Sequence, residues 1–528
     1  IHEAPRNTLE QKLLEIWQQL LEVDAIGIHS NFFELGGHSL LAMRVISAIS
    51  KNIGLELSIK ELFLHPSIAT LGEHLSTKVA ENALPPIEKG LRTGRLPLSF
   101  SQERLWFIDK FEGSRQYHLF NVFDLKGDLN IEALEQSLRA LVARHEILRT
   151  VILDDNGVPY QFIEDHSNWK LDNFTIANTK KRSAQTQDYI HRPFKLDTDF
   201  MLRAALIQID EHHFELVIVM HHIATDGWSV NILIEELKAF YDAFSQNIEL
   251  QLPVNDIQYA DYAIWQKIHI QDEIIHKHLE YWKDKLANTV PLELPSDFAR
   301  PSIQSTKGAQ IGFTIDYDLT AKINQLSLET GTTLFMSLLA SFKVVLHKYT
   351  LQQDICVGTV TAGRPNKALE SMVGFFVNTL ALRSHPVAEH TFTDLLNEVK
   401  YATLEAFDHQ NLPFEKVVDA VVQDRDLSRT PLFQVMFVLQ NTPNNQVLSL
   451  NGLEMISQPH QTDSVKYDLT LNIEEIDNKL EVNIEYCSDL FTAERMQNLG
   501  KHFVKVLEAV TLNPQQQIKN IDIISNEE

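Results

Sequence analysis

The hydrophobic pattern of this 528-residue chain changes its period once, and that change constrains the fold more than any other feature. Up to about residue 79, apolar residues recur only at the spacing of amphipathic helices. The expected helices span residues 8–22, residues from Ser39 onward, 58–63 and 67–78. Because the connections between them are short, residues 1–79 are predicted to form a small all-α bundle of four helices.

Residues 80–95 show no strong periodicity, and their prolines and glycines are typical of a linker. From residue 96 onward, strand-like runs alternate with amphipathic helices, which favours a mixed α/β (α+β) class. The clearest expected elements are helix 131–144, strand 214–220, helix 229–244, helix 320–329, helix 333–349, strand 354–360 and strand 433–440. This length exceeds one ordinary hydrophobic core, so the chain is expected to be multidomain.

Charge and cysteine content narrow the possible functions. The formal net charge is −25, whereas nucleic-acid binding needs an excess of Lys and Arg. The two cysteines, Cys356 and Cys487, do not form a disulfide framework, and they favour a reducing, cytoplasmic setting. No apolar stretch reaches about 18 residues, so no membrane span is expected. The first residues show neither an initiator Met nor a signal pattern, as expected of a piece of a longer chain.

Ser39, at the start of the second expected helix, has an unusual context. It follows Gly36, Gly37 and His38. A serine at a helix start is first of all an N-cap, but capping explains neither the two glycines nor the histidine. The string Asn31–Leu40 resembles the phosphopantetheine attachment motif of peptidyl carrier proteins in nonribosomal peptide synthetases. It departs from the family where Ser30 or Asn31 replaces a common Asp.

The resemblance implies that Ser39 carries a covalent 4'-phosphopantetheine. A phosphopantetheinyl transferase would load it from coenzyme A, because an exposed hydroxyl at a loop–helix junction is accessible to such an enzyme. Glycines before the serine leave room for the backbone of that partner. Mg²⁺ would serve only the loading enzyme.

A second string lies at the end of an apolar strand. His221 and His222 are followed by Asp226 and Gly227 in a loop, and Ser229 can cap the next helix. A neutral histidine could remove the proton of a nucleophile, or merely hold and orient that nucleophile. The pair could also be structural, and as a metal site the spacing is a weak signal.

The ten residues Met220–Ser229 resemble the core motif of condensation domains in nonribosomal peptide synthetases. Six further strings match that family in the expected order, at residues 99–106, 144–150, 259–265, 374–379, 409–415 and 425–432. In two of these strings, Asn411 replaces a common Asp and Thr430 a common Asn.

The resemblance implies two chloramphenicol-acetyltransferase-like lobes in a V, at residues 96–265 and about 275–528, with the active site in a tunnel between them. His222 would be the active-site residue, and His221 and Gly227 would shape its loop. Asp226 would form a structural ion pair with Arg364. The substrate channel would be lined by Asn378 and Ser229. No metal is expected in catalysis.

The implied reaction transfers a donor acyl group to the amine of a downstream carrier-bound aminoacyl thioester. The implied partners are an upstream adenylation domain, and downstream adenylation and acceptor carrier domains. Because the attached carrier comes first in the chain, it should be the donor. An epimerisation-type domain, a coenzyme A-dependent acyltransferase and a non-catalytic docking module remain as alternatives. A heterocyclisation domain is excluded, because it would carry Asp in place of the histidine pair.

Overall fold

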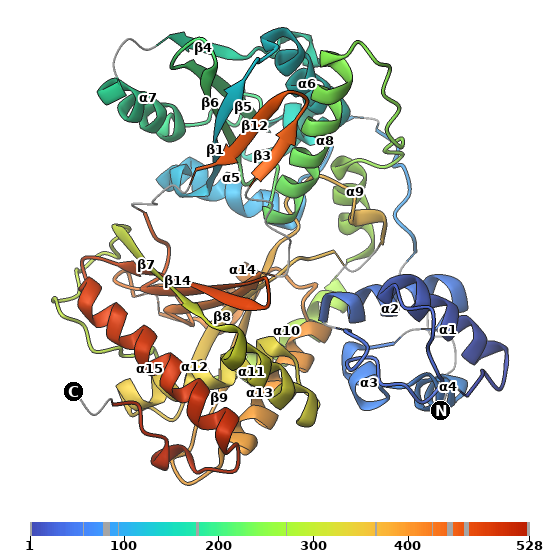
Figure 1. The fold of residues 1–528 in the computed structure, drawn as a ribbon, viewed down its shortest axis with the longest axis vertical. Helices are drawn as coiled ribbons and strands as arrows, with labels where there is room; N and C mark the ends of the chain where they lie inside the picture. The colour runs from blue at the N-terminus through green and yellow to red at the C-terminus, as the bar shows by residue number, and fades with distance from the viewer. Residues whose placement is uncertain are drawn as a thin grey trace.

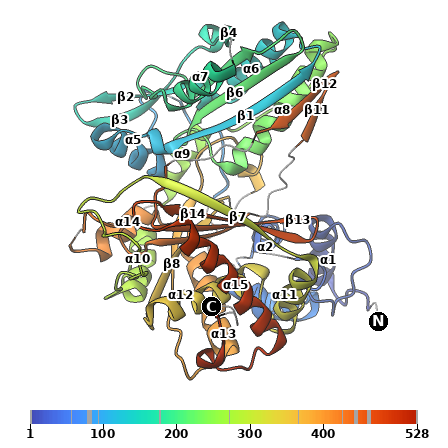
Figure 2. The same cartoon turned by 60° about the vertical axis from the view of Figure 1, so that its left-hand side comes forward.

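A computed structural model describes residues 3–37, 39–55, 57–77, 85–92, 94–175, 179–270, 272–364, 367–424, 426–440, 447–458 and 464–524. A small helical bundle lies beside two larger lobes, each built around a six-stranded sheet (Figures 1 and 2). The expected fold class, an all-α bundle followed by a two-lobed α/β unit, is therefore confirmed.

The N-terminal bundle contains α1 (Thr8–Leu21), α2 (Ser39–Ile53), α3 (Ile59–Leu64) and α4 (Ile68–Ser76). Asn7, Ser58 and Ser67 cap α1, α3 and α4 by accepting backbone N–H groups of the first turn. All four helices bury apolar residues in one core around Trp17, which is fully buried. The sequence-based expectation for this bundle matches to within two residues at each helix end that it named.

The first lobe has the strand order β11-β12-β1-β6-β5-β4. Its strands are β1 (His118–Gly127), β4 (Asp172–Thr175), β5 (Leu202–Gln208), β6 (His213–His221), β11 (Val447–Leu450) and β12 (Leu453–Ser457). A separate hairpin joins β2 (Thr150–Asp155) and β3 (Val158–Ile163). The helices are α5 (Phe100–Glu112), α6 (Ile131–Arg144), α7 (Thr179–His191), α8 (Gly227–Ser245) and α9 (Tyr259–His269).

The expected lobe boundary is wrong for one segment. β11 and β12 come from the second half of the chain, yet β12 pairs antiparallel with β1 and completes the first sheet (Figure 1). Leu453 and Met455 of β12 are buried in the core of the first lobe. The crossover buries apolar side chains and satisfies backbone groups of β1 that would otherwise form an open sheet edge.

The second lobe has the strand order β7-β14-β13-β10-β8-β9. Its strands are β7 (Gly308–Ile315), β8 (Ile355–Thr361), β9 (Asn378–Ser384), β10 (Val435–Gln440), β13 (Leu469–Ile476) and β14 (Lys479–Cys487). Its helices are α10 (Asp272–Leu286), α11 (Tyr317–Glu329), α12 (Leu334–Thr350), α13 (Phe392–Asp408), α14 (Phe414–Val421) and α15 (Ala493–Leu512).

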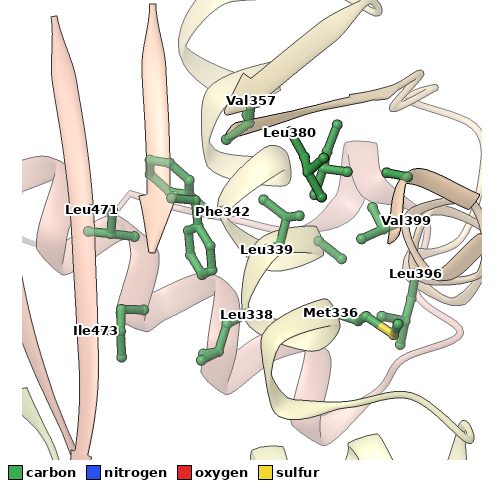
Figure 3. Packing of buried hydrophobic residues seen from close by; sticks show 14 of the residues in the cluster. Met336, Leu338, Leu339, Phe342, Val357, Leu380, Leu396, Val399, Leu471 and Ile473 are labelled. Atoms are coloured by element: carbon green, nitrogen blue, oxygen red, sulfur yellow. The ribbon is translucent and has the colours of Figure 1, made fainter. Parts of the chain in front are cut away.

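Helix α12 is the centre of the second core. Its side chains Met336, Leu339 and Phe342 pack between sheet residues such as Leu471 and the helix α13 (Figure 3). A helix that is apolar on most of its surface is typical of such a buried position. The described helices include none that is long and apolar enough by itself to cross a membrane, although the bent pair α11–α12 meets the length and composition criteria together.

The second half of the expected linker is fixed to the first lobe. Gly90 N–H and the Arg92 guanidinium both donate to the carboxylate of Asp261 in α9, and Arg92 also pairs with Glu146. Ile87 is buried in the first core. Residues 78–84 and 93 lie outside the described residues. Residues 87–92 are therefore held against the first lobe, because a buried carboxylate needs these donors.

Candidate active site between the lobes

His222 follows directly after β6, an inner strand of the first sheet. β6 is buried along its apolar run, as expected of a strand that is covered on both faces. The backbone N–H of His222 donates to the carbonyl of Tyr117 at 2.8 Å and thereby ties the strand end to the short helix Arg115–Tyr117. The chain turns out of the core at this point, and the His222 ring is half-buried at the cleft between the lobes.

The His222 ring is held as one neutral tautomer. Its Nδ1 lies 2.8 Å from the carbonyl oxygen of Thr225, and since a carbonyl only accepts, Nδ1 carries the proton. Burial, and then repulsion from Lys466, lowers the pKa of His222 to about 4. Nε2 therefore keeps its lone pair at neutral pH. The Phe375 ring, 4.8 Å away between centroids, packs against the imidazole.

His221 is fully buried and is not among the described residues that line the cleft. Its Nδ1 accepts from the Ile223 N–H at 3.0 Å, so its Nε2–H donates to the Ser114 hydroxyl at 2.8 Å. Burial holds its pKa well below the ordinary range. These bonds fix the loop that presents His222, which is the loop-shaping role expected for His221 from the sequence.

Asp226 joins the two lobes. Its Oδ1 accepts from the backbone and side chain of Ser229, both at 2.8 Å, and so caps α8. Arg364 of the second lobe donates to both carboxylate oxygens, at 3.0 and 3.3 Å, and the Phe376 N–H donates to Oδ2 at 3.0 Å. Both charged side chains are at most 1% exposed. The ion pair expected from the sequence is present.

Arg364 also organises the segment of the second lobe that enters the first core. Its other terminal nitrogen donates to the carbonyls of Leu369 and Met372, and its guanidinium lies 4.2 Å from the centroid of the Phe376 ring. Both terminal nitrogens of this buried cation therefore donate to carbonyl, carboxylate or hydroxyl oxygens. Its Nε–H has no hydrogen-bond partner among the described residues. The segment that carries Phe375 to His222 is held in place by this arginine.

Gly374 allows that segment to approach the first lobe. A Cβ at this position would lie 2.0 Å from the ring of Tyr259 in α9. The Tyr259 hydroxyl donates to the carbonyl of Phe375 at 2.7 Å and contacts the Ser99 hydroxyl at 2.8 Å. A side chain at position 374 would force either the Tyr259 ring or this segment to shift.

A cleft of about 1690 Å³ opens in front of His222. Arg104, Phe107 and Tyr117 line it from the first lobe, and Phe375, Phe414 and Lys466 are among the residues that line it from the second lobe. Arg104 forms an ion pair with Glu415 of α14 at 2.6 Å, which bridges the lobes across the cleft. The cleft is thus large enough for an extended substrate and combines apolar walls with few charges near the imidazole.

Two expected channel residues have other roles. Ser229 is fully buried, and its hydroxyl takes part in the Asp226–Arg364 network. Asn378 donates to the carbonyls of Gln410 and Leu412, both at 2.7 Å, and accepts from the Phe414 N–H. Neither residue is among those that line the cleft in the described part of the chain. Their polar groups are used up in holding backbone, so the expectation that they line the channel is wrong.

Gly227 begins α8, directly after the capping Asp226, and a Cβ there would meet no atom within 4 Å. The described residues include no cluster of three or more His, Cys, Asp or Glu side chains arranged to hold a metal ion. The sequence did not single out Lys466, which lies in none of the matched strings, and it gave no role to Phe375, although Phe375 lies in the string 374–379.

Helix α2 of the bundle is seated where the two lobes meet. Its Arg44 forms an ion pair with Glu370 of the second lobe at 2.9 Å and lies 5.9 Å from the ring of Trp228 in α8. Trp228 donates to the Glu370 carbonyl at 2.8 Å. Together these contacts join the bundle, the first lobe and the second lobe at one place. In both views α2 lies to the right of α5, which lines the cleft (Figures 1 and 2).

Ser39 is the first residue of α2, five residues before Arg44, while its side chain and all of His38 lie outside the described residues. Gly36 before it has a φ of +93° and open space around its Cβ position. At Gly37 the space is closed instead, because a Cβ would lie 2.4 Å from the buried Phe32 ring. The loop is packed on one side and open on the other, which fits the attachment of a prosthetic group at Ser39.

Two family models match the chain. One, for a condensation domain, matches residues 92–528, and another, for a phosphopantetheine attachment site, matches residues 11–75. Gramicidin S synthase 2 of Aneurinibacillus migulanus is 36% identical over 532 residues, which is 99% of this chain and 12% of that protein. Surfactin synthase subunit 1 of Bacillus subtilis (strain 168) is 36% identical over 529 residues, 99% of this chain and 14% of that protein. The chain thus spans a small fraction of these relatives.

Solved structures show the same two-lobed fold. A chain described as the complex of the X-domain and OxyB from teicoplanin biosynthesis has a TM-score of 0.77 and 28% identity, and the match covers 84% of this chain and 99% of that one. The first condensation domain of the calcium-dependent antibiotic synthetase has a TM-score of 0.67 and 16% identity, with 82% of this chain and 100% of that one covered, which shows the fold alone.

Proposed function

The chain belongs to the condensation-domain family, with a phosphopantetheine attachment domain before it, and we propose that it forms a peptide bond within a nonribosomal peptide synthetase. The matched ranges support a carrier at residues 1–79 and a condensation domain at 96–528, with residues 80–95 between them. One observation carries the proposal: a carrier domain is seated on the lobe junction at Trp228, six residues along the chain from His222.

The proposed reaction is an acyl transfer between two thioesters. A 4'-phosphopantetheine on Ser39 would supply the thiol that carries the donor acyl group. The amine of an acceptor aminoacyl thioester attacks the donor carbonyl, so that a C–N bond forms and the C–S bond breaks. The sulfur leaves with the electron pair of that bond, and the proton lost by the amine ends on the released thiol. Atoms and charges balance without a metal or an oxidant.

His222 acts in this proposal by accepting a hydrogen bond. A ring whose pKa is about 4 does not retain a proton near pH 7, so it is a weak base. Its Nε2 lone pair can accept the N–H of the attacking amine and align the nitrogen with the carbonyl, which favours orientation over full proton removal. Holding two tethered substrates in this geometry replaces tight binding with proximity.

The attached carrier is proposed as the donor. It contacts the lobes at Arg44, Glu370 and Trp228, whereas the open cleft lined by Arg104 and Lys466 is free for the acceptor. The proposed partners are an upstream adenylation domain, downstream adenylation and acceptor carrier domains, and a phosphopantetheinyl transferase.

Loading of Ser39 tests the carrier assignment. Incubation with coenzyme A, Mg²⁺ and a promiscuous phosphopantetheinyl transferase is expected to add one phosphopantetheine mass to the intact protein. The Ser39→Ala variant should gain nothing, and Ser50→Ala on the same helix should be loaded like the unchanged chain. Loading of Ser39→Ala, or no loading of the unchanged chain, would contradict the assignment.

Reversal of one charge tests the docking surface. Arg44→Glu places a carboxylate beside Glu370 and is expected to slow transfer from loaded Ser39 by about three- to tenfold, the range for a partly exposed ion pair plus a new repulsion. Combining Arg44→Glu with Glu370→Arg should restore most of the rate. Lys12→Glu on α1 is the matched control. Equal rates for Arg44→Glu and Lys12→Glu would show that this contact does not serve transfer.

A docking module without catalysis is the second candidate. The solved relative at 28% identity is described in complex with another protein, OxyB, so a recruiting role is compatible with this fold. The two functions differ in one respect, because recruitment does not need the Nε2 of His222 and peptide-bond formation does.

A further inference from the structure

Lys466 occupies a fixed place in the cleft of His222. The backbone around it is anchored to the segment that precedes β7: Val465 N–H donates to the Thr306 carbonyl at 2.8 Å, and Gln304 donates to the Lys466 carbonyl at 2.7 Å. The side chain is exposed to solvent and lines the cleft. Its backbone position is set by these two hydrogen bonds.

One residue connects the Lys466 ammonium to the active-site histidine. The Nζ atom lies 4.1 Å from the centroid of the Tyr117 ring, a cation–π distance. The carbonyl of the same Tyr117 accepts the His222 N–H at 2.8 Å. Tyr117 thus places the positive charge in the same part of the cleft as the imidazole.

This positive charge is not neutralised by an adjacent carboxylate. Among the described residues, no Asp or Glu lies within ion-pair distance of Lys466 Nζ, whereas the neighbouring Arg104 is paired with Glu415 at 2.6 Å. The ionisable groups that interact with Lys466 are Tyr117, Arg104, His221 and His222 from the first lobe, and Glu485 of β14 from the second. Glu485 attracts the ammonium and Arg104 repels it.

Lys466 is still mostly protonated at neutral pH, but it loses its proton at a lower pH than an ordinary lysine. Partial loss of hydration against the cleft walls, followed by repulsion from Arg104, lowers the pKa of Lys466 to about 8. Lys466 is in turn the charged group that most depresses the pKa of His222. A cation in this place acts on any positive charge that enters the cleft, and not on His222 alone.

We propose that Lys466 is a positioning residue for the reaction: its ammonium repels positive charge from the part of the cleft beside His222, so that an acceptor amine there is present as the free base. This inference rests on the proposed function, because it needs an amine as the nucleophile. Only a neutral amine has the lone pair that attacks the thioester. Ordinary α-amino groups have a pKa of about 7.7–8.0, so most would enter protonated at pH 7 and be unreactive.

The pH dependence of transfer tests this role with two variants. Lys466→Met keeps the length of the side chain and removes the charge, and Lys466→Arg keeps the charge. Transfer from loaded Ser39 to an aminoacyl N-acetylcysteamine thioester is measured between pH 6 and pH 9. Lys466→Met is expected to move the acid limb upward by about one pH unit, with a loss of about tenfold at pH 6 and almost none at pH 9. Lys466→Arg should keep the limb of the unchanged chain.

A second acceptor separates electrostatics from packing. A thioester whose nucleophilic nitrogen is a weakly basic hydrazide stays neutral over the whole range, so Lys466→Met should leave its pH profile unchanged. An equal loss at every pH, or the same loss with both acceptors, would overturn the inference and indicate a packing role. If the unchanged chain makes no amide at any pH, the proposed function fails instead. Lys466→Gln replaces Lys466→Met if the latter does not fold.

Discussion

Replacement of His222 by alanine is expected to slow peptide-bond formation by about 10²- to 10⁴-fold, because the attacking amine loses the hydrogen-bond acceptor that aligns it with the donor carbonyl. The Nδ1–H of His222 is used in the hydrogen bond to the Thr225 carbonyl. The lone pair of Nε2 therefore remains as the hydrogen-bond acceptor of this ring in the cleft. The measurement is a single-turnover transfer from loaded Ser39, followed by intact-protein mass spectrometry.

Two controls decide how the His222→Ala result is interpreted. Loading of Ser39 and the thermal unfolding midpoint should match those of the unchanged chain, since the ring is half-buried and its removal leaves the Asp226 network intact. His212→Ala, an exposed histidine of the same lobe, should transfer at the normal rate. A normal rate in His222→Ala would favour the docking module over the enzyme.

Removal of Arg364 is expected to destabilise the lobe junction by about 3–5 kcal/mol, because Arg364→Met leaves the Asp226 carboxylate buried without its cation. The variant should also lose most transfer, since the segment that carries Phe375 is released. The fall in the denaturant midpoint reports the first effect, and hydrogen exchange at the start of α8 locates it. Arg139→Met, which breaks the partly exposed pair with Glu135, should change stability by less than about 1 kcal/mol.

A double variant separates the loss of the pair from the loss of the charge. Asp226→Asn combined with Arg364→Met removes both charges and should recover part of the stability that Arg364→Met loses. A double variant as unstable as the sum of its single variants would show that the two side chains do not act as a pair.

The sequence predicted those features that depend on local pattern. The spacing of apolar residues predicted α1, α3 and α4, because the helical period and the capping residue both lie within the helix segment itself. The resemblance of the Met220–Ser229 string to a known motif implied the site of His222 and the pairing of Asp226 with Arg364, and this ion pair is present. Each of these inferences rests on residues whose chemistry limits them to few environments.

Features that depend on distant pairing were not predictable. β12 joins β1 across more than 300 residues of sequence, and nothing in its own pattern tells which sheet it completes. The side chains of Asn378 and Ser229 would suit a substrate channel as well as a buried hydrogen-bond network. Only the positions of their partners in the folded chain determine which of the two they form. The contact of Gly90 with Asp261 was not predictable for the same reason, because Asp261 lies far away in the chain.

The central claim is that this chain transfers an acyl group from its own carrier to an amine. The most direct measurement loads Ser39 with an aminoacyl-phosphopantetheine, adds an aminoacyl N-acetylcysteamine thioester, and follows the intact mass of the protein and the small-molecule products over one turnover. The account predicts that the acyl mass leaves the protein only when the acceptor is present, and that a dipeptidyl thioester appears in equal amount. Loss of the acyl mass at the same rate without acceptor, or retention of the mass with it, would contradict the claim.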